Sequence, residues 1–283
     1  MIADRAAGLR LSRVARLRAA VSHARMRVHP SPRGPGRRAG PERPRPAPRA
    51  RARRTTVALG FVVAALTSPL RAGGLAEHER RWLDAAAPVL AEARAQRLPL
   101  DVVVQPQPNA GESPVAMAFV DGRCKLVLTA RGPGGGALRT EAFDADAPSH
   151  VVEAIAAHEL AHCWRHAQGT WRAPPAGFAP GRAPAGAAVD LAARIEEMRA
   201  TRREEGFADL VSLAWTARRH PARYAEVHAW LLGLRGDAEP RGSHYDTAAW
   251  LARARDPSVF AGGGSVFERA SVPWRDGFRS GED

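Results

Sequence analysis

The sequence predicts an α+β fold with a small antiparallel sheet and a mostly helical remainder, preceded by a disordered segment rich in Arg and Pro. Two short apolar runs at residues 117–120 and 124–129 flank an Asp-Gly pair, the pattern of a β-hairpin. Apolar residues recur at helical spacing over longer stretches, such as 75–97 and 188–219. Pro and Gly crowd residues 30–49, which cannot build a core.

Residues 1–54 form a strongly basic segment. They contain 16 Arg and two acidic residues, a net charge of +14, whereas the whole chain carries +13, so the remainder is close to neutral. The segment has no Phe, Tyr or Trp that could stack on bases. We therefore favour a disordered extension, or a start codon assigned too early, over a nucleic-acid-binding tail, and we expect no nucleic-acid partner.

Residues 55–74 have the features of a signal peptide or membrane anchor. Three Arg residues within 51–54 precede an apolar run over 57–66, and small residues follow at 72–74. The apolar run is short for a transmembrane helix. We expect export to the periplasm or the cell exterior, with a membrane tether through residues 55–74 as the alternative.

The expected domain covers residues 75–256. It begins with a helix over 75–97, in which Pro88 is a candidate for a break or kink. Residues 100–104 form a candidate strand, and the hairpin follows. Ser149 is a plausible N-cap for the next helix because it directly precedes a helical apolar pattern.

The second half of the chain is predicted to be helical. Residues 174–184 form a Pro- and Gly-rich loop, and 188–219 form one long helix or two. A further helix starts at Pro221 and extends to residue 234. Residues 257–283 show little periodicity and are expected to be an irregular C-terminal tail.

A His-Glu-x-x-His motif at residues 158–162 is the strongest chemical signal in the sequence. Val151, Ile155, His158 and His162 share the spacing of one helical face, so both imidazoles can reach one metal ion. Glu159 projects from an adjacent azimuth, from which it can touch a water at the metal without being a ligand. The motif predicts a zinc site with Glu159 as general base.

A catalytic zinc site needs a third protein ligand and one open position. Glu205 is the preferred candidate because Asp209 lies one helical turn further on and can accept the free ring N–H of a ligand His. Glu204 has no such partner at the matching position. His166 lies on the same helix as the first two His, too far along the axis from His158 to share an ion.

These two motifs resemble those of the gluzincin metallopeptidases, most closely the HtpX-like peptidases and the minigluzincins. In these families a His-Glu-x-x-His helix is followed by a Glu-x-x-Ala-Asp helix, matched here by residues 158–162 and 205–209. The resemblance implies a zincin-like fold with His158, His162 and Glu205 as zinc ligands. It also implies that the first hairpin strand, including Met117, Ala118 and Phe119, binds peptide substrate.

A weaker part of the resemblance concerns residues 243–247, Ser-His-Tyr-Asp-Thr. HtpX-like peptidases have a Ser/Thr-His-Pro step at this place, and its His can stabilise the oxyanion of the tetrahedral intermediate. The resemblance therefore implies a catalytic role for His244. Tyr245 stands where the family has Pro, which makes Tyr245 a rival donor.

The chain has two cysteines, Cys124 on the second hairpin strand and Cys163 next to His162. In an exported domain they could form a disulfide between the strand and the metal helix, and otherwise they are two buried thiols.

The sequence thus predicts an exported zinc metallopeptidase, an endopeptidase more than an exopeptidase, that acts on a peptide or protein substrate. The alternative is a zinc-binding, non-catalytic interaction domain of the same fold. A nucleic-acid binder that uses the Arg-rich segment is a third hypothesis, and it predicts salt-dependent binding.

Overall fold

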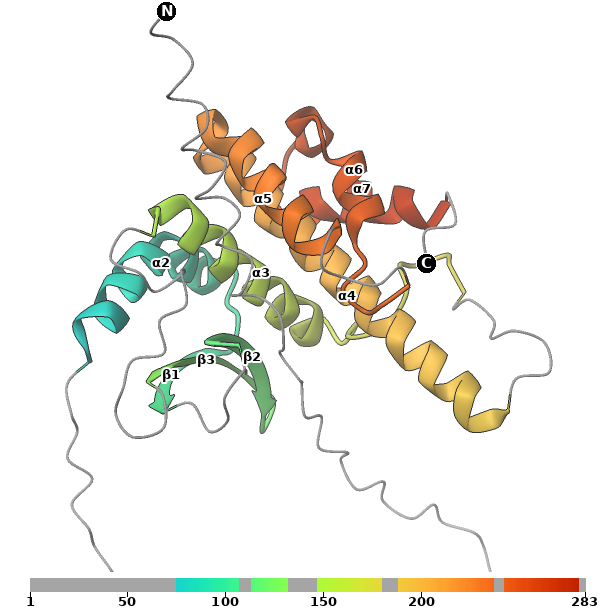
Figure 1. The fold of residues 1–283 in the computed structure, drawn as a ribbon, viewed down its shortest axis with the longest axis horizontal. Helices are drawn as coiled ribbons and strands as arrows, with labels where there is room; N and C mark the ends of the chain where they lie inside the picture. Colours follow the sequence, from blue (N-terminus) through green and yellow to red (C-terminus); the bar gives the residue numbers. More distant parts are fainter. Residues whose placement is uncertain (1–74, 107–112, 132–146, 180–187, 237–241, 280–283) are drawn as a thin grey trace, which may run out of the picture. The chain divides into compact units, whose positions relative to one another are not determined.

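The computed structural model describes residues 75–106, 113–131, 147–179, 188–236 and 242–279 (Figure 1). The predicted disordered segment and the predicted signal peptide lie outside the described residues. Within these ranges, no helix has both the length and the apolar composition needed to span a bilayer. The described residues form six α-helices and one three-stranded sheet, which confirms the α+β class.

The sheet contains β1 (Leu100–Pro106), β2 (Val115–Val120) and β3 (Arg123–Arg131), in the order β1-β3-β2. The predicted hairpin is confirmed, because β2 and β3 pair in an antiparallel register. Asp121 and Gly122 form its turn with φ values of 51° and 74°. Two successive positive φ values match the right-handed twist of a hairpin, and Gly adopts them without strain.

The prediction of a wholly antiparallel sheet is wrong for β1, which runs parallel to β3. Leu126 and Leu128 of β3 are completely buried, as suits a central strand. Asp101 of β1 accepts a hydrogen bond from Arg123 Nε at 2.8 Å and pairs with Lys125, its neighbour in the register. Strand direction here depends on contacts between distant segments, which hydrophobic periodicity does not report.

Helices α2 (Glu77–Ala95) and α3 (Ser149–Ala167) lie together on one side of the sheet (Figure 1). α2 continues through Pro88 and buries Trp82 and Val89. α3 is the central helix, since almost all of its residues are buried. Ser149 is its first helical residue rather than its N-cap, because the extended Pro148 occupies the cap position.

A disulfide joins Cys124 of β3 to Cys163 of α3. It connects the middle of the sheet to the helix turn that carries His162. Both cysteines are fully buried, so the disulfide is part of the core.

The predicted region 188–219 is one continuous helix, α4 (Val189–Arg219), which packs along α3. Ser212 Oγ of α4 donates a hydrogen bond to the Ala154 carbonyl of α3 at 2.7 Å, so the two helices approach closely. The chain then passes through the short 3-10 helix η3 (Pro221–Arg223) into α5 (Tyr224–Gly236).

Gly206 allows α6 (Ala248–Arg253) to pack tightly against α4. A Cβ atom at Gly206 would lie 2.5 Å from the Trp250 ring, closer than real Cβ contacts allow. The Trp250 indole therefore rests on the α4 backbone directly beside Glu205.

The expectation of an irregular tail over 257–283 is wrong. The short 3-10 helix η4 (Pro257–Phe260) leads into α7 (Val266–Arg279), which packs on α4. Ser265 Oγ accepts from the Glu268 N–H at 3.3 Å, and Glu268 accepts from the Ser265 N–H at 2.7 Å, a capping box. The sequence did not predict this helix because Pro273 and several glycines interrupt the helical spacing of its apolar residues. The buried residues are Val266, Phe267, Ala270, Trp274 and Phe278.

Candidate metal centre

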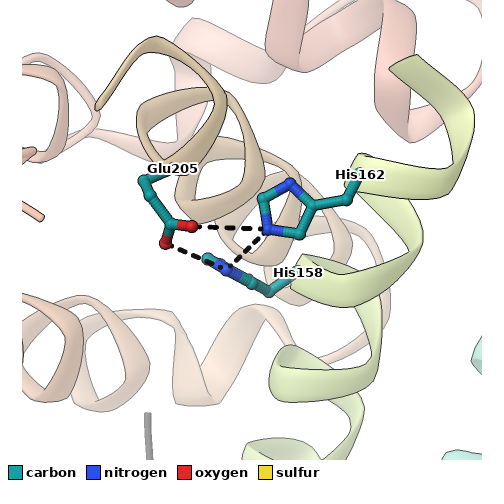
Figure 2. A group of neighbouring side chains, drawn as sticks. All are labelled: His158, His162 and Glu205. Carbon is teal, nitrogen blue, oxygen red and sulfur yellow. Dashed lines mark hydrogen bonds and ion pairs between the residues drawn. The ribbon is translucent and has the colours of Figure 1, made fainter. Parts of the chain in front are cut away.

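His158 and His162 project from successive turns of α3 toward α4 (Figure 2). Both side chains are buried, and their Nε2 atoms lie 3.2 Å apart. The four-residue spacing on a helix places them one above the other on a single face. The helix alone is thus sufficient to bring these two nitrogen donors together.

Glu205 of α4 completes a triangle of ligand atoms (Figure 2). Its Oε2 lies 3.4 Å from His158 Nε2, and its Oε1 lies 3.6 Å from His162 Nε2. All three residues are buried, and the group could hold a metal ion. The structure therefore brings together the ligand set that the sequence favours.

Asp209, one turn beyond Glu205, orients His158. Its Oδ1 lies 3.0 Å from His158 Nδ1, which leaves His158 Nε2 directed at the triangle. Thr247 Oγ1, at the start of α6, donates to Asp209 Oδ2 at 2.6 Å. This contact fixes the carboxylate that in turn fixes the tautomer and ring plane of the histidine.

Arg235 is the site residue that sequence reasoning missed. From α5, its guanidinium donates to Asp209 Oδ2 and Oδ1, both at 2.9 Å, and to Glu205 Oε2 at 3.1 Å. Its side chain is 3% exposed, and the guanidinium carbon lies 5.2 Å from the centroid of the Tyr245 ring. Only one signal in the sequence pointed to it, namely an Arg directly after the apolar stretch 229–234.

The electrostatics of the centre favour a cation between the ligand atoms. Burial alone would lower the pKa of His158, but hydrogen bonds to Asp209 and Glu205 raise it to about 10. Burial would raise the pKa of Glu205, but His158 and Arg235 lower it to about 2. Burial lowers the pKa of His162 to about 3, so this imidazole stays neutral and keeps a lone pair for coordination.

Glu159 lies beside the triangle and contacts the sheet. Its carboxylate accepts a hydrogen bond from the backbone N–H of Met117 on β2. Burial, opposed in part by the positive charge of His158, raises the pKa of Glu159 to about 7. A carboxyl group with a pKa near neutrality can both accept and return a proton at physiological pH.

β2 is an edge strand of the sheet, and its free edge faces Glu159. Thr129 N donates to the Pro114 carbonyl at 2.8 Å, which sets the alternation of the β2–β3 ladder. By that alternation Ala118 bonds to β3, while Met117 and Phe119 direct their backbone groups to the free edge. Of the three predicted substrate-binding residues, Phe119 thus directs both its N–H and its C=O to the free edge, and Met117 directs its C=O there while its N–H bonds to Glu159.

The two rejected ligand candidates have other contacts. Glu204 points away from the triangle to Arg165, whose Nη2 lies 3.0 Å from Glu204 Oε1, and it accepts from the Arg172 N–H at 2.7 Å. The His166 ring stacks on Phe119 with centroids 4.0 Å apart.

His244 is exposed, and its ring lies 4.1 Å from the ring of Tyr245. Tyr245 is buried and lies against Arg235, so His244 is connected to the candidate ligand Glu205 through two intervening side chains. The structure does not group His244 with the triangle, and its role in stabilising an oxyanion stays a prediction.

No family model, no curated protein and no solved structure matches this chain. The functional argument therefore rests on the chemistry of the site.

Proposed function

We propose that this protein is a zinc-dependent peptidase, with His158, His162 and Glu205 as the zinc ligands. Zinc bonds to His nitrogen and carboxylate oxygen are about 2.0–2.2 Å long, so two ligands of a tetrahedral ion lie roughly 3.3–3.5 Å apart. The three observed separations, 3.2, 3.4 and 3.6 Å, agree with that spacing. This agreement is the observation that carries the proposal.

The charges around the triangle also suit a divalent cation. Glu159, Glu205 and Asp209 are buried carboxyl groups near the ligands, and Arg235 is the buried guanidinium that faces two of them. A metal ion at Nε2 of His158 would displace the proton that this residue otherwise holds, since its pKa is raised to about 10. Three ionised carboxylates then oppose one guanidinium, and a divalent cation balances the difference. Buried charges that remain uncompensated would cost several kcal/mol each.

Bound zinc supplies Lewis acidity, which polarises a substrate carbonyl and lowers the pKa of water. Glu159 then acts as the general base: a carboxylate oxygen takes a proton from the attacking water. The same oxygen, now protonated, delivers that proton to the nitrogen of the departing amine. The Met117 N–H orients the Glu159 carboxylate for both steps.

The free edge of β2 is proposed to bind the substrate as an added strand. Backbone pairing to the Met117 C=O and to Phe119 requires no particular substrate sequence, and it fits an extended stretch within a longer chain. This favours an endopeptidase acting on peptides or unfolded proteins.

The test is hydrolysis of an unfolded protein by the full chain supplied with zinc. Wild type should cleave the substrate, and a chelator should abolish cleavage. Glu159→Gln should retain zinc and lose activity by about 10²–10⁴-fold. Glu153→Gln is the matched control, because Glu153 is a buried glutamate of α3 that accepts from Trp215 Nε1 at 2.8 Å, away from the triangle.

Equal activity of Glu159→Gln and wild type would remove Glu159 from its role. Stoichiometric zinc binding without any turnover would replace the proposal with the alternative, a zinc-binding interaction domain of the same fold.

We further propose export to the periplasm or the cell exterior. The Cys124–Cys163 disulfide supports this, because structural disulfides persist mainly in oxidising compartments. N-terminal sequencing of the protein from its native host tests it. Export by a cleaved signal predicts a mature chain starting near residue 75, and a tether predicts that residues 55–74 are retained. A cytoplasmic protein starting at Met1 would contradict both.

A further inference from the structure

The two candidate histidine ligands differ in what holds their rings. Asp209 Oδ1 lies 3.0 Å from His158 Nδ1 and fixes that imidazole. His162 Nδ1 is buried and has no hydrogen-bond partner among the residues that the structure describes. A histidine that binds a metal through Nε2 carries its proton on Nδ1, and this N–H usually has a contact that sets the ring plane. A different kind of contact must therefore orient His162.

Trp171, in the turn that follows α3, lies beside His162. The centroids of the two rings are 5.5 Å apart, and the ring planes are nearly perpendicular, at 85°. Aromatic rings favour this edge-to-face arrangement, in which an N–H at the edge of one ring can donate to the face of the other. The indole thus offers a contact to the imidazole that has no polar partner.

The Trp171 indole has no hydrogen bond that would fix it elsewhere. Its Nε1 is buried and has no polar partner within the described ranges. Its other ring contact is with Phe119 of β2, at a centroid distance of 5.1 Å. Trp171 therefore contacts both a candidate metal ligand and the edge strand.

Contacts from α3 and α4 hold the backbone next to Trp171. Glu204 Oε1 accepts from the Arg172 N–H at 2.7 Å, and Glu204→Gln would keep an acceptor for this bond. The buried Arg165 pairs with Glu204 and also donates to the Ala173 carbonyl. Arg172 has a φ of 62°, in a region that residues with a side chain rarely adopt. Such a conformation persists only where surrounding contacts impose it, so the fold defines the path of the chain at Trp171.

We propose that Trp171 is the positioning residue of the metal ligand His162. The indole face does for His162 what the Asp209 carboxylate does for His158. It fixes the plane of the imidazole and keeps Nε2 directed at the other two ligands. The inference rests on the metal-binding part of the proposed function and does not depend on peptide hydrolysis.

The experiment measures the zinc affinity of the full-length protein by competition with a chromogenic chelator. Trp171→Leu keeps an apolar side chain but removes the aromatic face. It should weaken zinc binding by about tenfold, the lower end of the effect of removing a group that orients a ligand. Trp171→Phe keeps an aromatic face and should stay close to wild type.

Trp164→Leu is the matched control. Trp164 is a partly buried Trp of α3, and its ring stacks on Phe207 and Phe267 at centroid distances of 5.7 and 5.4 Å. Trp164→Leu therefore also removes an indole that packs on aromatic rings, but it should keep the wild-type zinc affinity.

Cobalt(II) in place of zinc gives a second readout, because its visible absorption bands depend on the arrangement of the ligands. The bands should shift in Trp171→Leu and stay unchanged in Trp164→Leu. A loss of folding stability alone would leave the bands of the folded protein where they are in wild type. If Trp171→Leu does not fold, Trp171→Met takes its place in both measurements.

Three outcomes overturn the inference. One is a Trp171→Leu variant that equals Trp164→Leu in zinc affinity or in its cobalt bands. Another is a Trp171→Phe variant that loses as much zinc affinity as Trp171→Leu, because the aromatic face would then not be what holds the imidazole. In both cases wild type still binds zinc, so the proposed function stands.

The third outcome is a wild type that binds no zinc, which overturns the proposed function together with this inference. The expected ranking of zinc affinities and the expected cobalt bands, found in a protein that cleaves no peptide, would support the inference and overturn only the peptidase function.

Discussion

Replacing Arg235 with Met tests the charge balance of the site. Methionine keeps much of the length of the side chain but removes the guanidinium, which makes two hydrogen bonds to Asp209 and one to Glu205. Arg235 and its two partners are all buried, so water cannot replace the lost contacts. Removing one partner of a buried ion pair costs about 3–5 kcal/mol. That is a large part of the roughly 5–15 kcal/mol by which domains are stable.

The loss should depend on zinc. Without the metal, Asp209 and Glu205 lose their guanidinium partner, and the full cost is expected. With zinc, the cation compensates part of the negative charge of these two carboxylates. Zinc should therefore raise the free energy of unfolding of Arg235→Met by more than it raises that of wild type. The matched control is Arg203→Met. Arg203 is a buried Arg of α4 whose Nη2 lies 2.7 Å from Glu196 Oε1, outside the metal centre.

The assay is urea unfolding followed by tryptophan fluorescence, with zinc in one series and chelator in the other. A lower midpoint at constant slope reports lost stability. Arg203→Met should lose the same free energy in both series, and Arg235→Met should lose more in chelator. The reasoning is refuted if the free energy of unfolding of Arg235→Met in chelator is less than about 1 kcal/mol below that of wild type. A loss that small is typical of an ion pair on the surface. The reasoning is also refuted if the loss is independent of zinc.

Three further predictions concern single contacts. Glu205→Gln should lose most bound zinc on dialysis against a weak chelator while Glu204→Gln keeps it; metal analysis that ranks them in the reverse order would contradict the ligand assignment. Gly206→Ala should cost about 1–3 kcal/mol in urea unfolding, since its Cβ would lie 2.5 Å from the Trp250 ring, and a neutral effect would show that α6 can move freely. Hydrogen bonds to two cations of β3 hold the pKa of Asp101 well below its usual value of 3.8, so its carboxylate stabilises the fold above pH 3.8 and this stabilisation is lost as the pH falls below it. In Asp101→Asn, the free energy of unfolding should therefore fall less steeply than in wild type as the pH decreases below 3.8. An unchanged pH dependence would exclude this contribution of Asp101.

The sequence by itself determined the features that depend on local geometry. Helical spacing was sufficient to place His158 and His162 side by side, because residues four apart on a helix face the same way. The Asp121-Gly122 turn likewise specified the hairpin, since its backbone conformation depends on those two residues. The capping box between Ser265 and Glu268 is equally local, and it could have predicted α7.

Only the tertiary structure decided which distant groups meet. Glu204 and Glu205 are neighbours, but the rotation of α4 against α3 sends one to Arg165 and the other to the two histidines. The parallel pairing of β1 with β3 and the approach of Arg235 to Asp209 also join separate segments. Such contacts depend on how whole elements pack, and packing reflects the shapes of many side chains at once. Local spacing in a sequence carries no direct record of them.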